Sequence, residues 1–449
     1  MTKEDDRARS GRLGHELVVA WIYLAIMAAS ALPTPLYPLY RQRLDLPASG
    51  ITAVYGFYAI VVLLTLLRLG SLADRIGRRP VLTAAVALTV LSEVVLAVSP
   101  TLAGLYLGRG LVAVAVGLAI AALPAFLADL AGPGRAARAA VFAVAANMGG
   151  QALGTFAAGA VTAAEPLVTP YLIGLGLLVP AVLLWTTRVP ETLPALRGPR
   201  QRPVKRIPPA LRADYRAIAM TIVGAFAMFG SMTAMTGQIL QQRMLVTGTS
   251  TTGLVTAAMF ASGAVGQLLA RRIATARNPA VMVVPVPLAA LLLCWATSAG
   301  SLPIFAVAVS VCGFAGGSCL RAGSIRVLAL SPVENRAHVS SRLFAALYLG
   351  ASVCTVSAGL LATEVGLDAA MLGLGLLVLA LSAGAALLLS RLPGTGEALA
   401  TTDVLDLTGL YSVESTVQFF AVPAARPFRS DALEFPPSRG RLTGLEKLE

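Results

Sequence analysis

The sequence predicts an all-α membrane protein with twelve transmembrane helices in two pseudo-symmetric six-helix halves. Three observations predict this fold class. Hydrophobic residues make up 57% of the 449 residues and charged residues only 13%, with a mean hydropathy of +0.78, whereas soluble domains carry about 25% charged residues. Apolar stretches recur along the chain at the length of about 20 residues that a bilayer requires. Finally, patterns in the first half of the chain return in the second.

Twelve stretches meet this length. They cover residues 17–40, 50–70, 80–99, 102–128, 139–163, 168–187, 216–238, 251–270, 279–298, 302–329, 343–363 and 368–390. The first is too long for the apolar core of a signal peptide, so we interpret it as an uncleaved span. A segment rich in Pro and Arg separates six spans from six and is too polar to be buried. The predicted segments are a cytoplasmic N-terminus (1–16), an N-terminal half (17–187), a basic cytoplasmic linker (188–215), a C-terminal half (216–392) and a mostly disordered cytoplasmic tail (393–449).

Arginine and lysine gather in every second loop, whereas the loops between hold only Arg41, Arg43 and Arg243. Because basic residues in short loops stay in the cytoplasm, both termini are predicted to be cytoplasmic, in the cell (inner) membrane. With a net charge of +13, the expected partner of the basic loops is an anionic lipid leaflet. A nucleic-acid partner is not expected, because no aromatic residues interleave with the basic ones. The abundance of Ala and Arg favours a bacterial source.

The residues of catalytic and metal sites are scarce. The four cysteines lie in apolar stretches without a CxxC pair, and the chain has two histidines, so we expect no metal and no cofactor. The sequence also has no HExxH, no P-loop, no carboxylate cluster and no evident nucleophile–base pair. A membrane enzyme or receptor is the alternative class, and we expect that the protein is not an enzyme.

The internal repeat supports a division into halves. With an offset of 201 residues, Arg135 corresponds to Arg336 and Gly149 to Gly350. Parallel six-helix repeats are typical of transporters whose substrate site lies between the halves.

A charged block, GSLADRIGRRP at 70–80, lies between the second and third spans. Gly70 and Gly77 permit a tight turn and a close helix approach, and the arginines hold the loop inside. Asp74 is not needed for that sorting. Its carboxylate can accept bonds from a neighbouring helix N-terminus or pair with arginine, contacts that are lost when the neighbour moves. The alternative is a topology signal without a moving part.

The extended block GSLADRIGRRPVL resembles the signature loop of the major facilitator superfamily, G-x-L-a-D-r-x-G-r-r-x-x-l. The twelve spans, the basic linker and the PET after the sixth span agree, so the resemblance covers about residues 15–392. It implies that Asp74 docks on a helix of the other half and stabilises the outward-facing state, while Arg78 and Asp129 complete a charge relay. Ala270 stands where the second copy would have the acid, which implies a one-sided latch. The residues of the predicted latch are Gly70, Asp74, Arg75, Gly77, Arg78 and Asp129.

Arg109 and Glu93 are charged residues inside predicted spans, where a charge costs about 3 kcal/mol or more unless it faces a cavity or a partner. Arg109, in the fourth span, resembles the arginine that the family links to proton coupling, although Ala113 replaces the glycine expected four positions later. The alternative is an arginine that extends outward to the lipid headgroups. Glu93, in the third span, is a candidate proton carrier or else a structural partner. Both are proton-coupling candidates.

The stretch ANMGGQALGTFAAG resembles the fifth-helix antiporter motif of the family, with Gly150, Gly154 and Gly159 in place and Thr155 instead of the proline. Small residues four apart also permit close helix packing in any membrane protein, which is the alternative. Three prolines end the first span, where Tyr37 and Tyr40 are expected to anchor the chain at the membrane interface.

Polar and aromatic residues on the spans that line the central site in this family are the candidates for contact with substrate. They are Tyr23, Tyr58, Asn147, Gln151, Gln238 and Tyr348. Because few charges are available inside, we expect an apolar, amphipathic or cationic substrate.

The resemblance implies a secondary active transporter that works by alternating access. We predict proton-coupled efflux of small hydrophobic or cationic compounds. The alternative is uptake or export of a specific metabolite, such as a sugar or an amino acid. The expected partners are a small-molecule substrate, protons and the lipid bilayer, and the protein is expected to be a monomer.

Overall fold

The computed structural model describes residues 3–132, 135–161, 165–188, 212–274, 283–330 and 336–390, and every regular element in them is a helix. The predicted tail lies outside the described residues, as does most of the predicted linker. Ten helices are long and apolar enough to cross a membrane. Two shorter apolar helices, Thr169–Leu183 and Pro285–Ala299, fall at the sixth and ninth predicted spans. Ten of the twelve predicted stretches therefore fall on helices of membrane-spanning length, and the other two fall on shorter apolar helices.

The first group of helices spans the part of the chain before the linker. Its elements are α1 (Lys3–Ala31), a 3-10 turn (Thr34–Leu36), α2 (Tyr37–Arg43), α3 (Ala48–Leu69), α4 (Leu72–Ile76), α5 (Arg78–Val98), α6 (Leu102–Ala131), α7 (Ala136–Ala160) and α8 (Thr169–Arg188). The first span is broken because Pro33 and Pro35 provide no N–H to continue α1. Helix α6 begins where the side chain of Thr101 accepts a bond from the Gly104 N–H.

The second group follows the linker. Its elements are α9 (Arg212–Arg243), α10 (Thr249–Ala274), α11 (Pro285–Ala299), α12 (Leu302–Leu330), α13 (Arg336–Leu349), a π-helical segment (Gly350–Cys354), α14 (Thr355–Glu364) and α15 (Leu367–Ser390). Helices α13 and α14 and the π-helical segment between them follow one another without a break. A π-helical bulge often marks a functional site.

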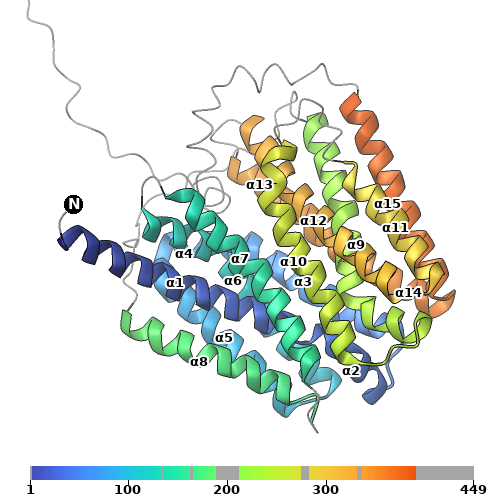
Figure 1. Cartoon of the computed structure of the whole chain (residues 1–449), viewed down its shortest axis with the longest axis horizontal. Coiled ribbons are helices and arrows are strands. Elements are labelled where there is room, and N and C mark those ends of the chain that lie inside the picture. The colour runs from blue at the N-terminus through green and yellow to red at the C-terminus, as the bar shows by residue number, and fades with distance from the viewer. Residues whose placement is uncertain are drawn as a thin grey trace, which may run out of the picture.

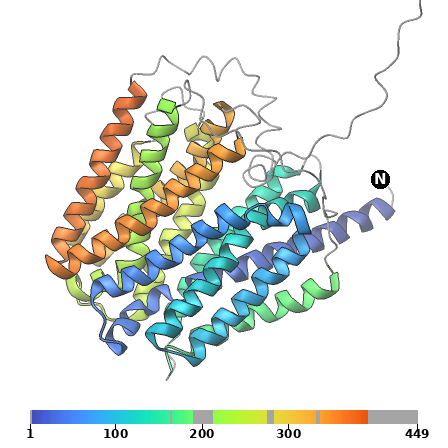
Figure 2. The same ribbon diagram turned by 180° about the vertical axis from the view of Figure 1, so that it is seen from behind.

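The two groups lie beside each other and run at an angle (Figures 1 and 2). We call the end where α8 stops and α9 starts the linker end, and the opposite end the distal end. At the distal end the groups touch directly. The Ser49 N–H donates to the Thr363 hydroxyl at 3.1 Å, joining the start of α3 to the end of α14. Nearby, Gly159 of α7 and Gly253 of α10 leave no room for side chains between their backbones.

Glycine also sets the contact between α1 and α7. A Cβ on Gly154 would collide with the carbonyl oxygen of Ala28, and one on Gly150 would lie 2.5 Å from that of Leu24. These two backbones meet at a separation that only glycine permits. The residues of the fifth-helix motif therefore pack helices, and Gly159 extends the same role to the second group.

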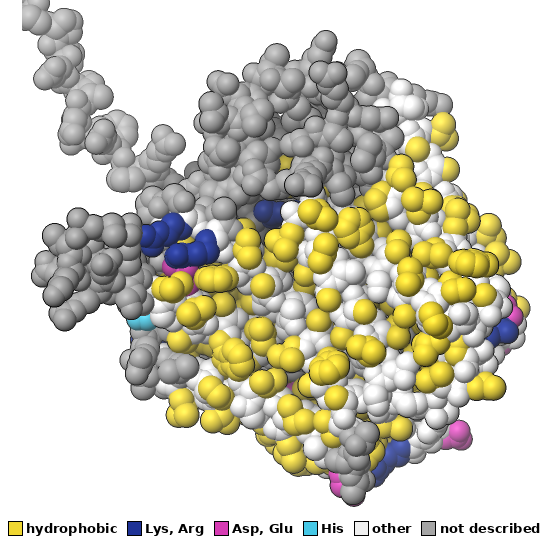
Figure 3. All heavy atoms as spheres, viewed as in Figure 1, with side chains coloured by type: hydrophobic (Ala, Val, Ile, Leu, Met, Phe, Trp, Pro, Cys, Tyr) yellow, Lys and Arg dark blue, Asp and Glu magenta, His cyan; other side chains and the backbone are white. Residues whose placement is uncertain are grey.

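The outside of the bundle is apolar. Large hydrophobic side chains such as Leu107, Leu183 and Leu288 are more than half exposed. Figure 3 shows hydrophobic side chains across the broad face and charged ones gathered at its margins. An apolar belt of this kind suits a lipid environment.

Tyr37 and Tyr40 correct the expectation of an interfacial anchor. Both are almost fully buried, and the Tyr40 hydroxyl lies 2.9 Å from that of Tyr171 on α8. The proline-broken segment folds back into the first group, so its tyrosines face protein and not headgroups.

Candidate functional site

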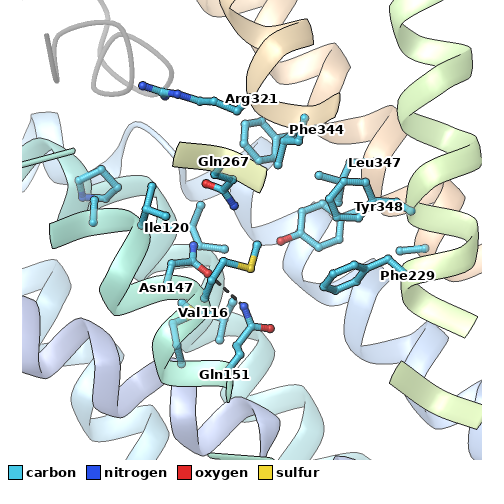
Figure 4. Close-up of a pocket in the computed structure, with 18 of the residues that line it drawn as sticks. Val116, Ile120, Asn147, Gln151, Phe229, Gln267, Arg321, Phe344, Leu347 and Tyr348 are labelled. Atoms are coloured by element: carbon cyan, nitrogen blue, oxygen red, sulfur yellow. Dashed lines mark hydrogen bonds between the residues drawn. The ribbon is translucent and has the colours of Figure 1, made fainter. Parts of the chain in front are cut away.

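A cavity of about 190 Å³ lies between the two groups of helices. Its walls come from α1, α3, α6 and α7 on one side and from α9, α10, α12 and α13 on the other (Figure 4). The lining reaches toward the linker end at Arg321 and Ser324, whereas the distal end is closed by the contacts described above. The cavity therefore approaches one end of the bundle only.

The first group supplies a polar wall. The Asn147 side-chain amide donates to the Tyr23 hydroxyl at 2.8 Å, and the Gln151 amide donates to the Asn147 side-chain oxygen at 3.0 Å. Asn147 and Gln151 lie one turn apart on α7, which places both on the same helix face. The two amides form a hydrogen-bonded row along the cavity (Figure 4).

The second group supplies an aromatic wall. Phe226 and Phe229 of α9 stand 5.5 Å apart between ring centroids, and Phe229 meets Phe260 edge to face at 5.3 Å. Phe344 and Tyr348, one turn apart on α13, complete this side (Figure 4). Rings packed in this way present a large apolar surface to a ligand.

The structure brings five of the six predicted cavity residues together: Tyr23, Tyr58, Asn147, Gln151 and Tyr348 all line it. Gln238 does not line this cavity, because it lies nine residues beyond Phe229 on α9, about 14 Å toward the distal end. Its side-chain amide nitrogen instead donates to the side-chain oxygen of Gln242 at 3.5 Å. Sequence reasoning missed the phenylalanines of the aromatic wall, since phenylalanine in an apolar span gives no signal that separates a cavity from lipid.

Arg109 is 1% exposed, so it does not extend outward to headgroups. One guanidinium N–H donates to the Ser30 carbonyl at 2.6 Å, near the end of α1. The guanidinium carbon also lies 3.9 Å from the ring centroid of Tyr58, a cation–π contact with a residue of the cavity wall.

Glu93 lies outside the cavity lining, inside the first group. It is fully buried on α5, and neither carboxyl oxygen has a hydrogen-bond partner in the described part of the chain. A Cβ on Gly174 would lie 2.6 Å from one of these oxygens, so α8 covers the carboxyl group closely. Among the described residues, Arg109 is the charge that acts on it.

The predicted latch lies at the linker end. Gly77 joins α4 to α5 with φ of 95°, a backbone conformation that favours glycine. The buried Arg78 makes an ion pair with Asp129 at the end of α6. Arg75 is exposed, and Gly70 ends α3. The side chain of Asp74 lies outside the described residues.

Two ion pairs, each with a buried acid, were not predicted. Arg138 of α7 pairs with the fully buried Glu16 of α1 at 2.5 Å. Arg326 of α12 donates twice to one oxygen of Asp214 on α9, each time at 3.2 Å. Hydropathy treats charges near the ends of spans as topology signals, and nothing in the sequence pairs residues 112 positions apart.

Membrane-length helices around a central cavity between two helix groups define a polytopic membrane transporter. The sequence profile of the Major Facilitator Superfamily matches residues 19–290, and the chain belongs to this family of transporters.

Solved structures show the same fold. A bacterial homologue of the human lysosomal transporter Spinster, in an inward-facing and unoccupied conformation, matches with a TM-score of 0.65 at 15% identity, over 92% of this chain and 99% of that one. The same homologue in an occupied conformation matches with a TM-score of 0.62 at 15% identity, over 90% and 95%. A point mutant of the nucleoside transporter NupG matches with a TM-score of 0.64 at 13% identity, over 87% and 99%. No curated protein matches the chain.

Proposed function

We propose that the protein is a monomeric secondary transporter that uses proton entry to export small hydrophobic or cationic compounds from a bacterial cell. The observation that carries the substrate class is the aromatic wall of the cavity, formed by Phe229 and its neighbours. Aromatic faces bind apolar groups and also attract cations.

Twelve spans in two six-helix halves would move around this site by alternating access. The distal contacts between α3 and α14 and the extension of the cavity toward the linker end support one of the two expected conformations. With the linker end in the cytoplasm, as the arginine distribution predicts, this conformation accepts substrate from inside.

The latch has a place in this cycle. The loop with Asp74, steadied by the Arg78–Asp129 ion pair, would dock on the second group when the linker end closes. Arg109 and Glu93 would couple this change to protons, because both are buried in the first group and Arg109 contacts Tyr58 of the cavity wall.

Uptake or export of a specific metabolite is the second candidate. The row of hydrogen-bonding groups formed by Tyr23, Asn147 and Gln151 favours a substrate that also forms hydrogen bonds, such as a sugar or an amino acid. A cavity without such a row would select by shape and apolar area alone.

The test is efflux of a fluorescent cationic dye from cells that express the wild type, Asp74→Asn or Arg109→Ala, with and without a protonophore. Leu107→Ala is the matched control, because Leu107 faces outward two residues before Arg109 on α6. We expect efflux from the wild type and the control, its loss with the protonophore, and its loss in both other variants at equal amounts in the membrane. If the dye stays inside in every case, while purified protein in liposomes moves a labelled sugar or amino acid, the second candidate replaces the first.

A further inference from the structure

The carboxyl group of Glu93 occupies a closed space between helices. It is fully buried, both oxygens lack a hydrogen-bond partner among the described residues, and the backbone of α8 at Gly174 covers one of them. An ionised carboxylate without hydrogen bonds is strongly disfavoured in such a place. In this conformation Glu93 therefore holds a proton.

Titratable side chains from three other elements face this space. Arg109 comes from α6, Tyr37 and Tyr40 come from α2, and Tyr171 comes from α8. The Tyr40 and Tyr171 hydroxyls lie 2.9 Å apart. Both tyrosines lie near the distal end, and Glu93 lies five residues before the end of α5, about 8 Å along the helix axis. The hydroxyl pair therefore lies on the distal side of the carboxyl group.

Arg109 connects this space with the cavity. It holds the Ser30 carbonyl and lies on the ring of Tyr58, which lines the cavity. Its Nε–H has no hydrogen-bond partner in the described part of the chain. An unused donor on Arg109 and two unused acceptors on Glu93 thus lie within electrostatic range of each other.

We propose that Glu93 is a proton-binding site separate from the substrate cavity. Arg109 is a positioning residue, whose contacts with the cavity wall change with the charge of Glu93. With the proton on Glu93, Arg109 stays on Ser30 and Tyr58. When water enters this space from the distal side, past Tyr40 and Tyr171, the O–H bond of Glu93 breaks and a water molecule takes up the proton. The carboxylate then attracts the guanidinium, which releases Tyr58 and the end of α1.

This inference deepens the proposed proton coupling and rests on it for its role in transport, but its test requires no substrate. The first measurement is infrared difference spectroscopy between acidic and alkaline buffers, on the purified full chain in lipid nanodiscs. We expect the C=O stretch of a protonated carboxyl group in the wild type at neutral pH, its loss in Glu93→Gln, and its retention in Asp368→Asn. Asp368 is the control because its carboxylate is exposed and paired with Arg243 at the distal end.

A milder variant keeps the proposal testable if Glu93→Gln does not fold. In Gly174→Ala the new methyl group would press on the carboxyl oxygen, so the band should shift in frequency without disappearing. A spectrum that is the same in the wild type, Glu93→Gln and Gly174→Ala would overturn the proposal.

The second measurement tests the role of Arg109. Spin labels at Gln42 and Glu364, both exposed at the distal end of the two groups, report opening there in a background where the four cysteines are replaced by alanine. We expect the distance between the labels to change with pH in the wild type but not in Glu93→Gln or in Arg109→Gln, while Arg109→Gln keeps the carboxyl band. A pH response that survives in Glu93→Gln would show that another group binds the proton.

The two proposals fail in different ways. If the band and the pH response behave as expected while no dye is exported, the proton site stands and the substrate class is wrong. If dye export depends on the proton gradient while Glu93→Gln changes neither the band nor the pH response, export stands and this site is wrong.

Discussion

The two groups of helices keep their polar side chains in different places. In α1–α8, Arg109 and Glu93 are buried well inside the helices, and an amide row lines the cavity. In α9–α15, the buried charges among the described residues are confined to the linker end, at Asp214 and Arg326, and the cavity wall is aromatic. We interpret the first group as the part that responds to charge and the second as the part that presents a fixed apolar surface.

One feature is nevertheless shared. Each group starts with a helix that carries a buried acid near the linker end, Glu16 on α1 and Asp214 on α9, and each acid pairs with an arginine of the same group. The partners come from different positions, Arg138 on α7 and Arg326 on α12. The ends of the two groups are therefore alike, while their interiors differ.

The largest expected effect breaks the ion pair of the second group. Asp214→Ala removes the carboxylate that faces Arg326, whose side chain is 2% exposed, and should cost about 3–5 kcal/mol of unfolding free energy. Arg138→Ala in the first group should cost less, about 1–3 kcal/mol, because the Arg138 side chain is 37% exposed and its pair with Glu16 is open to solvent on that side. Thermal unfolding of both purified variants in lipid nanodiscs measures the difference.

The double variant Glu16→Gln with Arg138→Gln is the control for the first group. It removes both charges and should recover most of the loss. Equal losses in Asp214→Ala and Arg138→Ala would mean that the exposure of the arginine does not decide the cost.

The next effect tests the close approach of helix backbones at glycine, which occurs in both groups. Gly154→Ala would force a Cβ against the Ala28 carbonyl, and Gly317→Ala would do the same against the Gly263 carbonyl. Each should cost about 1–3 kcal/mol of unfolding free energy, because the backbones would have to separate. Gly149→Ala is the matched control on α7, since nothing lies within 4 Å of its Cβ. A fall in unfolding temperature for Gly149→Ala equal to that for Gly154→Ala would contradict the close-approach explanation.

Sequence alone predicted where the helices lie, because hydropathy reports how long each apolar stretch is and proline and glycine report where it ends. The start of α6 at Leu102 and the break after Ala31 both follow from local residues. It could not predict which side of a helix faces protein. Tyr37 and Tyr40 have the composition of interface anchors, yet their helix turns them inward.

The candidate site was predictable at its amides and tyrosines but not at its phenylalanines. Asn147 and Gln151 stood out because polar residues are rare in these spans, whereas Phe229 resembled any lipid-facing residue. Gln238 stood out for the same reason but does not line the cavity. The polarity of a residue does not tell how far along α9 the cavity extends. Ion pairs such as Asp214–Arg326 depend on tertiary contacts that a single sequence does not reveal.

A smaller effect separates the two cavity walls. Phe229→Ala should raise the KM for all transported compounds about tenfold, because the lost aromatic contact is worth about 1.4 kcal/mol. Gln151→Leu should weaken only compounds that form hydrogen bonds and leave purely apolar ones unchanged. Phe156→Ala, half exposed on the outside of α7, controls for loss of a ring as such. Transport kinetics in liposomes distinguish these outcomes, and a uniform effect of Gln151→Leu would contradict the division between the walls.

The smallest effect concerns the aromatic contact that holds the charge of the first group. Tyr58→Phe keeps the ring face on which Arg109 lies and loses only the hydrogen bond of the hydroxyl with Ser30, whereas Tyr58→Leu also removes the ring and should cost about 1 kcal/mol more of unfolding free energy. Tyr55, whose ring lies 6.1 Å from that of Tyr58 and also lines the cavity, provides the matched pair Tyr55→Leu and Tyr55→Phe. The difference in unfolding free energy between the Leu and Phe variants is measured at both positions by thermal unfolding. A larger difference at Tyr58 than at Tyr55 gives the contribution of the cation–π contact apart from the loss of side-chain volume. The same difference at both positions would mean that Arg109 is held by the Ser30 carbonyl alone, and a shift of its charge would then reach α1 without passing through the cavity wall.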